Sequence, residues 1–182
     1  MKAIDVALFF IDLFNKDNRY IITNLKLNKL LYFAQGWYLS KYNEPLFDEQ
    51  IEAWDLGPVV ANVYQAYKPL GKNHIMIDRN EDNFDESKVS VEQLELLIDV
   101  YNNYSKFSAN ELVEMTHVKD SPWDKVYVKN ENKVIPNDLI KEYFLTQEKI
   151  PSISDIDFSL VDSIGHIDTD GHLILPSSER DD

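Results

Sequence analysis

The residues that most often carry catalysis are scarce or scattered in this sequence. The four histidines form no known metal-ligand spacing and lie at His74, His117, His166 and His172. Cysteine is absent, which excludes disulfides, thiolate metal sites and cysteine nucleophiles. No serine has the context of a nucleophile elbow, and no glycine-rich loop precedes a helix. We therefore predict no catalytic residue, no metal site and no cofactor, and we do not expect an enzyme.

Carboxylates, in contrast, are abundant. The chain has 32 acidic and 18 basic residues, which gives a formal net charge of −14. Glu52 with Asp55, or Asp120 with Asp124, are residue pairs of the kind used in acid–base catalysis, but with so many acids such pairs are expected by chance. A polyanion of this size repels nucleic-acid phosphates and attracts basic molecules. The charge disfavours direct nucleic-acid binding and favours a basic protein partner.

The stretch over residues 116–123 combines polar and aromatic side chains. Thr116 and His117 fall at the predicted end of one helix, and Pro122 and Trp123 begin the next. There, a His117 imidazolium would face the negative end of the helix dipole. Two interpretations remain open. Either this corner is a polar hinge that shapes a surface groove, or His117 caps carbonyl groups while Trp123 fills the core between two helices.

The densest apolar segment, residues 25–40, predicts the central helix that positions these side chains. Its apolar residues at helical spacing are Leu27, Leu30, Leu31, Phe33, Ala34, Trp37 and Tyr38. Gln35 lies within this stripe, and a buried amide would need hydrogen-bond partners. We interpret Lys26 and Lys29 as part of a solvated face, with their aliphatic stems on the apolar surface.

Capping signals and periodicity place the other elements. The central helix begins at a cap, Thr23 or Asn24, and stops at residues 43–45. Further helices are predicted over residues 3–14 and 58–67, and from starts at Ser90, Ser108, Ser121 and Asn137. Residues 50–55 alternate and predict a short strand or extended arm. Residues 72–88 predict a polar loop with one edge strand at 75–77.

The composition changes after Pro151. Residues 150–182 are acidic, with isolated apolar residues, and Asp170-Gly171 is a hairpin signal. This tail either forms a small β-ribbon or becomes ordered on a partner. We therefore divide the chain into a domain over residues 1–149 and a C-terminal extension.

The predicted fold class is mainly α with minor β: a compact helical domain with a short strand element and a β-prone tail. The predicted core comprises Phe10, Leu27, Leu30, Leu31, Ala34, Trp54, Val63, Leu94, Leu97, Leu112 and Trp123. No apolar run is long enough to span a membrane, and the N-terminal segment lacks the features of a signal peptide. We expect a cytoplasmic protein.

Three segments in order resemble a known family. They are KLNKLLYFAQGWYL over residues 26–39, IEAWDLGPVVANVYQAYKPLG over residues 51–71, and the Thr-His and Pro-Trp pairs of residues 116–123. Together they resemble the Panacea domain of SocA-like antitoxins. The resemblance implies a mainly helical antitoxin of a bacterial, often phage-associated, toxin–antitoxin pair, whose toxin is encoded by the adjacent gene and in many pairs stops translation.

The resemblance leaves the mechanism open. Direct neutralisation of the toxin by protein binding is favoured, and a protease adaptor that delivers the toxin for degradation is the alternative. A hydrolase with a diffuse site and a DNA-binding autoregulator are rival classes, although no basic helix-turn-helix is present. We predict partner-binding residues in both parts of the chain: Trp54, Asp55, Tyr64, His117, Trp123, Phe158, Ile164, Ile167, Leu173, Ile174 and Leu175.

Overall fold

The computed structural model describes residues 1–17, 19–76, 84, 89–148, 166–167 and 173–174. These residues form seven α-helices and a small three-stranded sheet, and two further short strands pair with each other. The predicted class, mainly α with minor β, is confirmed.

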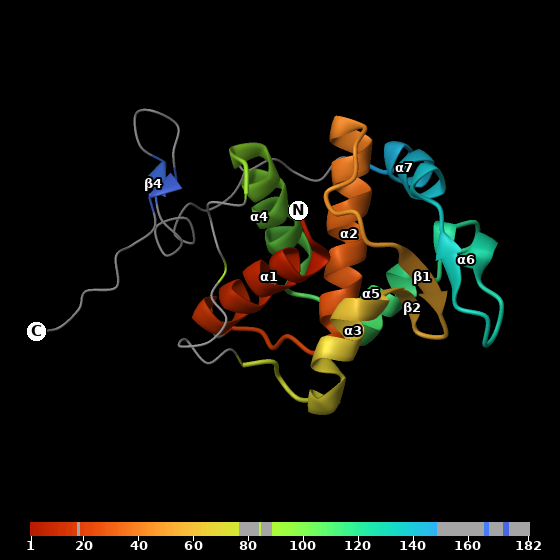
Figure 1. Ribbon diagram of the computed structural model, residues 1–182, viewed down its shortest axis with the longest axis horizontal. Helices are drawn as coiled ribbons and strands as arrows, with labels where there is room; N and C mark the ends of the chain where they lie inside the picture. Colours follow the sequence, from red (N-terminus) through yellow and green to blue (C-terminus); the bar gives the residue numbers. More distant parts are fainter. Residues whose placement is uncertain (18, 77–83, 85–88, 149–165, 168–172, 175–182) are drawn as a thin grey trace, which may run out of the picture.

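Helix α2 (Asn24–Tyr42) is the centre of the fold (Figure 1). Helices α1 (Ala3–Asp17) and α4 (Val91–Tyr104) pack on one side of it. The sheet, α5 (Ala109–Thr116) and α7 (Asn137–Leu145) contact its other faces. Because neighbours cover it on several sides, all its residues from Lys26 to Leu39 are buried.

The ends of α2 lie close to the predicted positions. The Thr23 side chain accepts a hydrogen bond from the Lys26 backbone N–H, which caps the first turn. Asn43 ends the helix in the left-handed conformation, with φ 61°, and its N–H donates to the Leu39 carbonyl. Gln35 has the partners that its burial requires, because its amide donates to the Phe47 carbonyl and accepts from the Leu46 N–H.

Lys26 and Lys29 are buried, at 4% and 0% exposure, so the prediction of a solvated face for them is wrong. Lys26 donates to the Ser105 carbonyl at 2.6 Å, and its ammonium lies over the Phe14 ring. Periodicity could not separate these lysines from surface lysines, because their partners come from segments distant in the sequence.

The sheet has the order β2-β1-β3, with all pairs antiparallel. Strand β1 (Ile51–Trp54) confirms the predicted arm, whereas β3 (Lys133–Ile135) was not predicted. Strand β2 (Gly57–Val60) replaces the predicted helix start at Pro58, and helix α3 (Ala61–Tyr67) begins three residues later. Pro58 lies on an edge strand, where a missing N–H is tolerated, and Val59 and Val60 favour extended backbone.

A 3-10 turn, η1 (Lys68–Leu70), follows α3, and the short helix α6 (Pro122–Val126) follows α5. The capping boxes at Ser90 and Ser108 are confirmed, and Ser121 caps α6. The predicted cap at Asn137 is wrong by one residue, since Pro136 is the N-cap of α7 and Asn137 lies inside the helix. Ile75 and Met76 form no strand, and the rest of that predicted edge strand lies outside the described residues.

The core confirms nine of the eleven predicted members, and the two exceptions are Trp54 and Leu94. Both are half-buried. Trp54 alternates with the buried Ala53 along β1, so its ring lies on the other face of the strand. Leu94 lies in the first turn of α4, at the rim of the core.

In the tail, β4 (His166–Ile167) and β5 (Leu173–Ile174) pair antiparallel, with His166 opposite Ile174 and Ile167 opposite Leu173. The predicted hairpin turn at Asp170-Gly171 lies outside the described residues. The predicted partner-binding residues Phe158, Ile164 and Leu175 lie outside the described residues.

Candidate protein-binding groove

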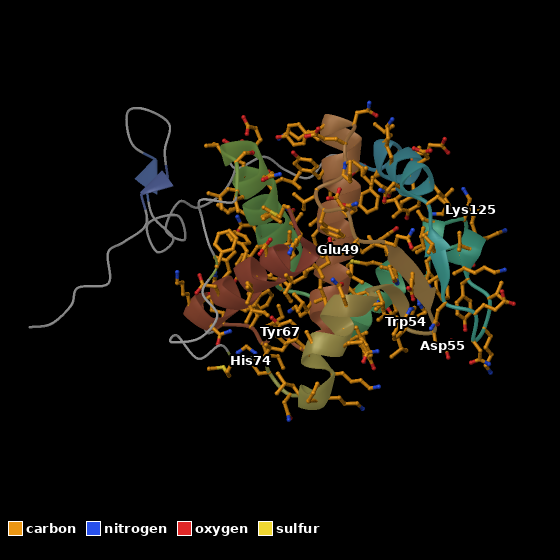
Figure 2. All side chains as sticks on the ribbon, viewed as in Figure 1. Glu49, Trp54, Asp55, Tyr67, His74 and Lys125 are labelled. Carbon is orange, nitrogen blue, oxygen red and sulfur yellow. The ribbon has the colours of Figure 1, made fainter. Side chains whose placement is uncertain are left out.

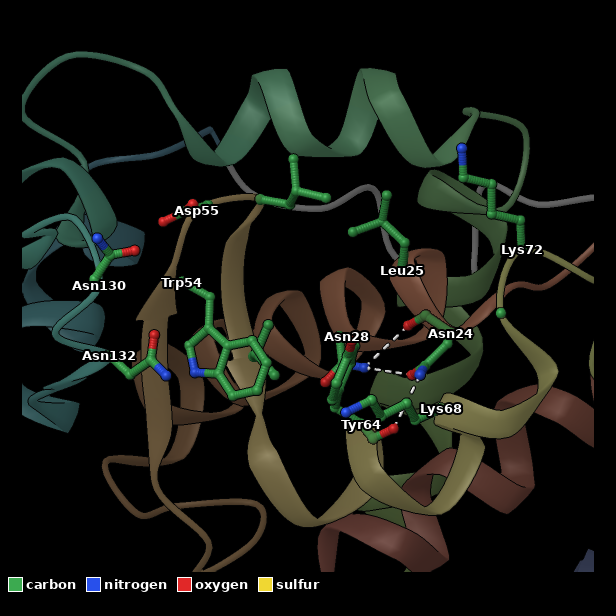
Figure 3. Close-up of a pocket in the computed structure, with 13 residues that line it drawn as sticks. Asn24, Leu25, Asn28, Trp54, Asp55, Tyr64, Lys68, Lys72, Asn130 and Asn132 are labelled. Carbon is green, nitrogen blue, oxygen red and sulfur yellow. Dashed lines mark hydrogen bonds between the residues drawn. The ribbon is translucent and has the colours of Figure 1, made fainter.

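A groove of about 580 Å³ lies where the start of α2, the β1–β2 hairpin and the α3–η1 segment meet (Figure 3). Its lining also includes two asparagines from the loop that precedes β3. The residues that line it are Asn24, Leu25, Asn28, Trp54, Asp55, Leu56, Val59, Tyr64, Lys68, Gly71, Lys72, Asn130 and Asn132. A volume of this size accommodates a small ligand or a few residues of a peptide.

Two asparagines of α2 hold the floor of the groove together. Asn28 accepts a hydrogen bond from the Val60 N–H at 3.0 Å and donates to the side-chain and backbone oxygens of Asn24. Asn24 in turn donates to the Tyr64 carbonyl at 2.9 Å. These bonds join α2 to β2 and α3, and they satisfy both amides within the protein.

Lys29 fixes the same hairpin from inside the core. Its ammonium donates to the Pro58 carbonyl at 2.8 Å, and no ion pair joins it to a carboxylate among the described residues. Burial lowers the pKa of Lys29 to about 7. Gly57 has φ +96°, and a Cβ there would lie 2.6 Å from Thr116 Oγ1 and 2.9 Å from Lys29 Nζ, so only glycine fits.

Aromatic side chains shape the hairpin end of the groove. The rings of Trp54 and Tyr64 meet edge to face at 4.9 Å. The Trp123 indole N–H donates to the Trp54 carbonyl at 2.8 Å, and the Tyr127 hydroxyl donates to Asp55 Oδ1 at 2.9 Å. Trp54 and Asp55 lie at the same exposed end of the molecule (Figure 2).

The His117 ring stacks on Trp123 at 3.6 Å, and Trp123 stacks on Tyr127 at 4.5 Å. Burial, and to a smaller extent the Lys29 ammonium, lower the pKa of His117, which favours the neutral ring. A neutral ring does not make the dipole contact that an imidazolium would make. The end of α5 is instead capped by the His117 backbone N–H, which donates to the Val113 and Glu114 carbonyls.

The predicted site residues of the helical domain thus come together. Trp54, Asp55 and Tyr64 line the groove, and His117 and Trp123 support its hairpin from behind. Within the described part of the chain, no group of three or more His, Asp or Glu side chains is arranged to hold a metal ion. None of the described helices is long and apolar enough to cross a membrane.

Comparison with known proteins places this arrangement in a family. The family model described as "Antitoxin SocA-like, Panacea domain" matches residues 27–124, which is more than half of the chain. The chain belongs to the SocA-like Panacea family. Antitoxin SocA of Caulobacter vibrioides (strain NA1000 / CB15N) is 30% identical over 118 residues, which cover 58% of this chain. The chain spans 60% of the length of that relative. No solved structure matches the chain.

The Panacea segment contains most of the groove. Asn28, the hairpin, α3, η1 and the His117–Trp123 stack all lie within residues 27–124, whereas Asn130, Asn132 and the tail lie outside it. Sequence reasoning did not assign the groove's lysines or asparagines to a binding site. These residues are Lys68, Lys72, Asn24, Asn28, Asn130 and Asn132. The available signal for Asn28 was an amide inside a mostly apolar helix, where a buried amide requires an internal partner.

Proposed function

We propose that this protein is an antitoxin that binds a cognate toxin protein directly and that the groove is its main contact surface. Membership of the antitoxin family supports the antitoxin role. The groove itself supports the choice of contact surface. Its half-buried Trp54 and exposed Leu56 are held by a hairpin that is hydrogen-bonded to the core. Rigid apolar anchors of this kind dominate the binding energy of protein interfaces.

The charge of the chain supports a basic toxin. At a net charge of −14, long-range attraction speeds the encounter with a basic protein. A toxin that acts on translation must approach RNA phosphates with a basic surface, and an acidic protein bound there would block that approach. We infer that the toxin is the product of the adjacent gene and that occlusion inhibits it in the cytoplasm.

The test is inhibition of the neighbouring gene's product in a purified mixture without proteases. Leu56→Asp is the groove variant, and Leu145→Asp is its matched control, because the two leucines are 58% and 59% exposed and Leu145 ends α7. We expect the wild type and Leu145→Asp to inhibit equally. Leu56→Asp should need at least about tenfold more protein, since the loss of one buried apolar anchor weakens binding by roughly 2 kcal/mol.

Equal inhibition by both variants would move the contact surface away from the groove. If no variant inhibits the toxin in the purified mixture, yet the toxin disappears in cells that express this chain, the protease-adaptor mechanism replaces direct neutralisation. Binding without any inhibition or degradation would contradict the antitoxin role.

We also propose that residues 150–182 form a second contact with the toxin, separate from the domain over residues 1–149. The support is compositional: this extension is acidic and carries isolated apolar side chains, including Ile167, Leu173 and Ile174 of the β4–β5 pair. Deletion of the residues after Ile150 should weaken rescue of cells that express the toxin. Full rescue by the shortened chain would remove the tail from the interface.

A further inference from the structure

The groove has a different charge balance from the rest of the protein. Its charged lining residues are Lys68, Lys72 and Asp55, so it carries one more positive than negative side chain. The whole chain, in contrast, has a net charge of −14. A segment that lies in the groove therefore meets lysines, although the molecule as a whole attracts cations.

The two lysines also have free ammonium groups, whereas the carboxylate is engaged. Lys68 belongs to η1 and Lys72 follows the Gly71 turn, and both are exposed. Neither pairs with a carboxylate among the described residues. Asp55 accepts a hydrogen bond from the Tyr127 hydroxyl. The hydrogen bond leaves the charge of Asp55 in place, so the lining keeps an excess of one positive charge.

The middle of the groove is largely apolar, and the amides beneath it are already used. Leu25, Trp54, Val59 and Tyr64 line it, and the Asn24 and Asn28 amides beneath them are already hydrogen-bonded within the protein. A polar group placed there would lose its water without gaining a partner. The middle of the groove therefore suits a large apolar side chain.

The far end of the groove presents two amides. Asn130 and Asn132 have left-handed backbones, with φ of 65° and 47°, and among the described residues neither side chain has a hydrogen-bond partner. Figure 3 shows them on the opposite side of Trp54 from Lys68 and Lys72. An amide both donates and accepts, so this end suits the backbone of an extended peptide.

We propose that the groove binds an extended segment of the partner protein in which a large apolar side chain is accompanied by an acidic residue. The apolar side chain packs against Trp54 and Tyr64, and the carboxylate lies toward the end of the groove lined by Lys68 and Lys72. This inference rests on the proposed function for the partner's identity, and it reverses the charge expected for the docked segment. The net negative charge of this protein attracts a basic toxin over a long range. An acidic segment of that toxin then fixes the position in which the toxin binds.

The first test compares two variants of equal charge. Lys68→Glu/Lys72→Glu reverses the groove lysines, and Lys2→Glu/Lys125→Glu reverses two exposed lysines elsewhere, of which Lys125 lies on α6 (Figure 2). Calorimetric binding of the neighbouring gene's product should weaken by about tenfold or more in the groove variant. The matched variant should stay within about threefold of wild type. Equal weakening in both variants, or tighter binding by the groove variant, would overturn the proposal.

The second test does not need the toxin. A phage library of random twelve-residue peptides is selected on the full-length chain, and the selected peptides are then measured against both charge variants. We expect peptides that combine a large apolar residue with Asp or Glu and that lose binding only to Lys68→Glu/Lys72→Glu. Basic peptides, peptides that bind both variants equally, or no enrichment at all would contradict the proposal. Acidic-apolar peptides together with a toxin that does not bind would instead refute the proposed function and leave the groove's preference established.

Discussion

The two halves of α2 are both buried, but they are buried by different kinds of neighbour. In the N-terminal half, the side chains of Asn24, Asn28 and Lys29 make hydrogen bonds to α3, β2 and the hairpin. In the C-terminal half most contacts are between aromatic rings: Tyr32, Phe33 and Trp37 pack on Phe144 of α7, and Phe33 also stacks on Tyr104 of α4. Hydrogen bonds of Gln35 and Trp37 accompany these ring contacts. One helix thus positions the groove with its first turns and stabilises the domain with its last.

The difference lies in how strongly each kind of contact fixes geometry. Ring packing contributes area and dispersion energy but tolerates small displacements. A hydrogen bond from Lys29 to the Pro58 carbonyl, or from the Val60 N–H to Asn28, holds at one distance and direction. We therefore expect changes in the aromatic half to alter stability more than binding, and changes in the polar half to alter binding as well.

The largest effect is expected for Phe144→Ala. The Phe144 ring contacts Tyr32, Phe33 and Trp37 and is 3% exposed. Its removal leaves a cavity between α7 and α2, which should lower the free energy of unfolding by about 3–5 kcal/mol in urea denaturation. Toxin affinity, measured below the unfolding transition, should remain within about threefold of wild type. A large loss of affinity would show that the two halves of α2 are not independent.

The next largest effect is expected in the pH dependence of the free energy of unfolding, compared between the wild type and Lys29→Met. Burial lowers the pKa of Lys29 to about 7, so from there up to the ordinary lysine value the unfolded chain binds more protons than the folded one. The free energy of unfolding of the wild type should therefore rise, relative to Lys29→Met, by on the order of 3 kcal/mol between about pH 7 and about pH 9.5.

Lys26 provides the control for this measurement. Burial also lowers the pKa of Lys26, to about 8, but that lysine is present in both proteins, so its contribution cancels in the difference. Urea denaturation at several pH values measures the two curves. Parallel curves would contradict the buried, unpaired ammonium of Lys29.

A smaller loss of stability is expected for Asn28→Ala, with a larger effect on binding. The substitution leaves the buried Val60 N–H without its acceptor, which should destabilise the protein by about 1–3 kcal/mol. Because β2 then keeps only the Lys29 bond of its two hydrogen bonds to α2, toxin affinity should fall by about tenfold. Asn103→Ala, which removes one hydrogen bond on α4, is the control and should leave affinity unchanged. Unchanged affinity in Asn28→Ala would show that the hydrogen bonds of Asn28 beneath the groove do not contribute to toxin binding.

Sequence reasoning predicted the apolar residues of α2 well and the polar residues of its first turns poorly, for the same physical reason. Apolar side chains repeat with the helical period, so Leu27, Leu30 and Leu31 could be assigned to the core from spacing alone. The role of a buried Lys29 depends on the Pro58 carbonyl, 29 residues away in the sequence, which no local pattern encodes. The capping boxes were predictable because both partners lie within one helical turn.

The groove was predictable in part. Trp54 and Tyr64 belong to the motif that carries the family resemblance, and their contact follows once the hairpin returns the chain to α3, which carries Tyr64. The hairpin itself was missed, because Gly57-Pro58 is typical of a helix start as well as of a turn into an edge strand. Asn130 and Asn132 lie more than sixty residues further along the chain, and only the pairing of β3 with β1 brings them to the groove.

The smallest effect is expected for a buried hydroxyl in the aromatic half. Tyr32 is 1% exposed, and its hydroxyl has no hydrogen-bond partner in the described part of the chain. Tyr101 is equally buried, but its hydroxyl donates to Asp17. Tyr32→Phe removes an unsatisfied polar group, so the free energy of unfolding should stay unchanged or rise by up to about 1 kcal/mol. Tyr101→Phe should lower it by about 1–3 kcal/mol, because a bond to a charged acceptor is lost.

Thermal and urea denaturation of these two variants measure the contrast directly. The same atom is removed from two equally buried tyrosines, so transfer of the ring from water contributes equally to both. The sign of the difference then depends only on whether the hydroxyl had a partner. If Tyr32→Phe destabilises the protein as much as Tyr101→Phe does, the hydroxyl of Tyr32 has an acceptor in solution. The ring cluster around Phe144 would then depend on a further directional bond besides those of Gln35 and Trp37, which would weaken the contrast between the two halves.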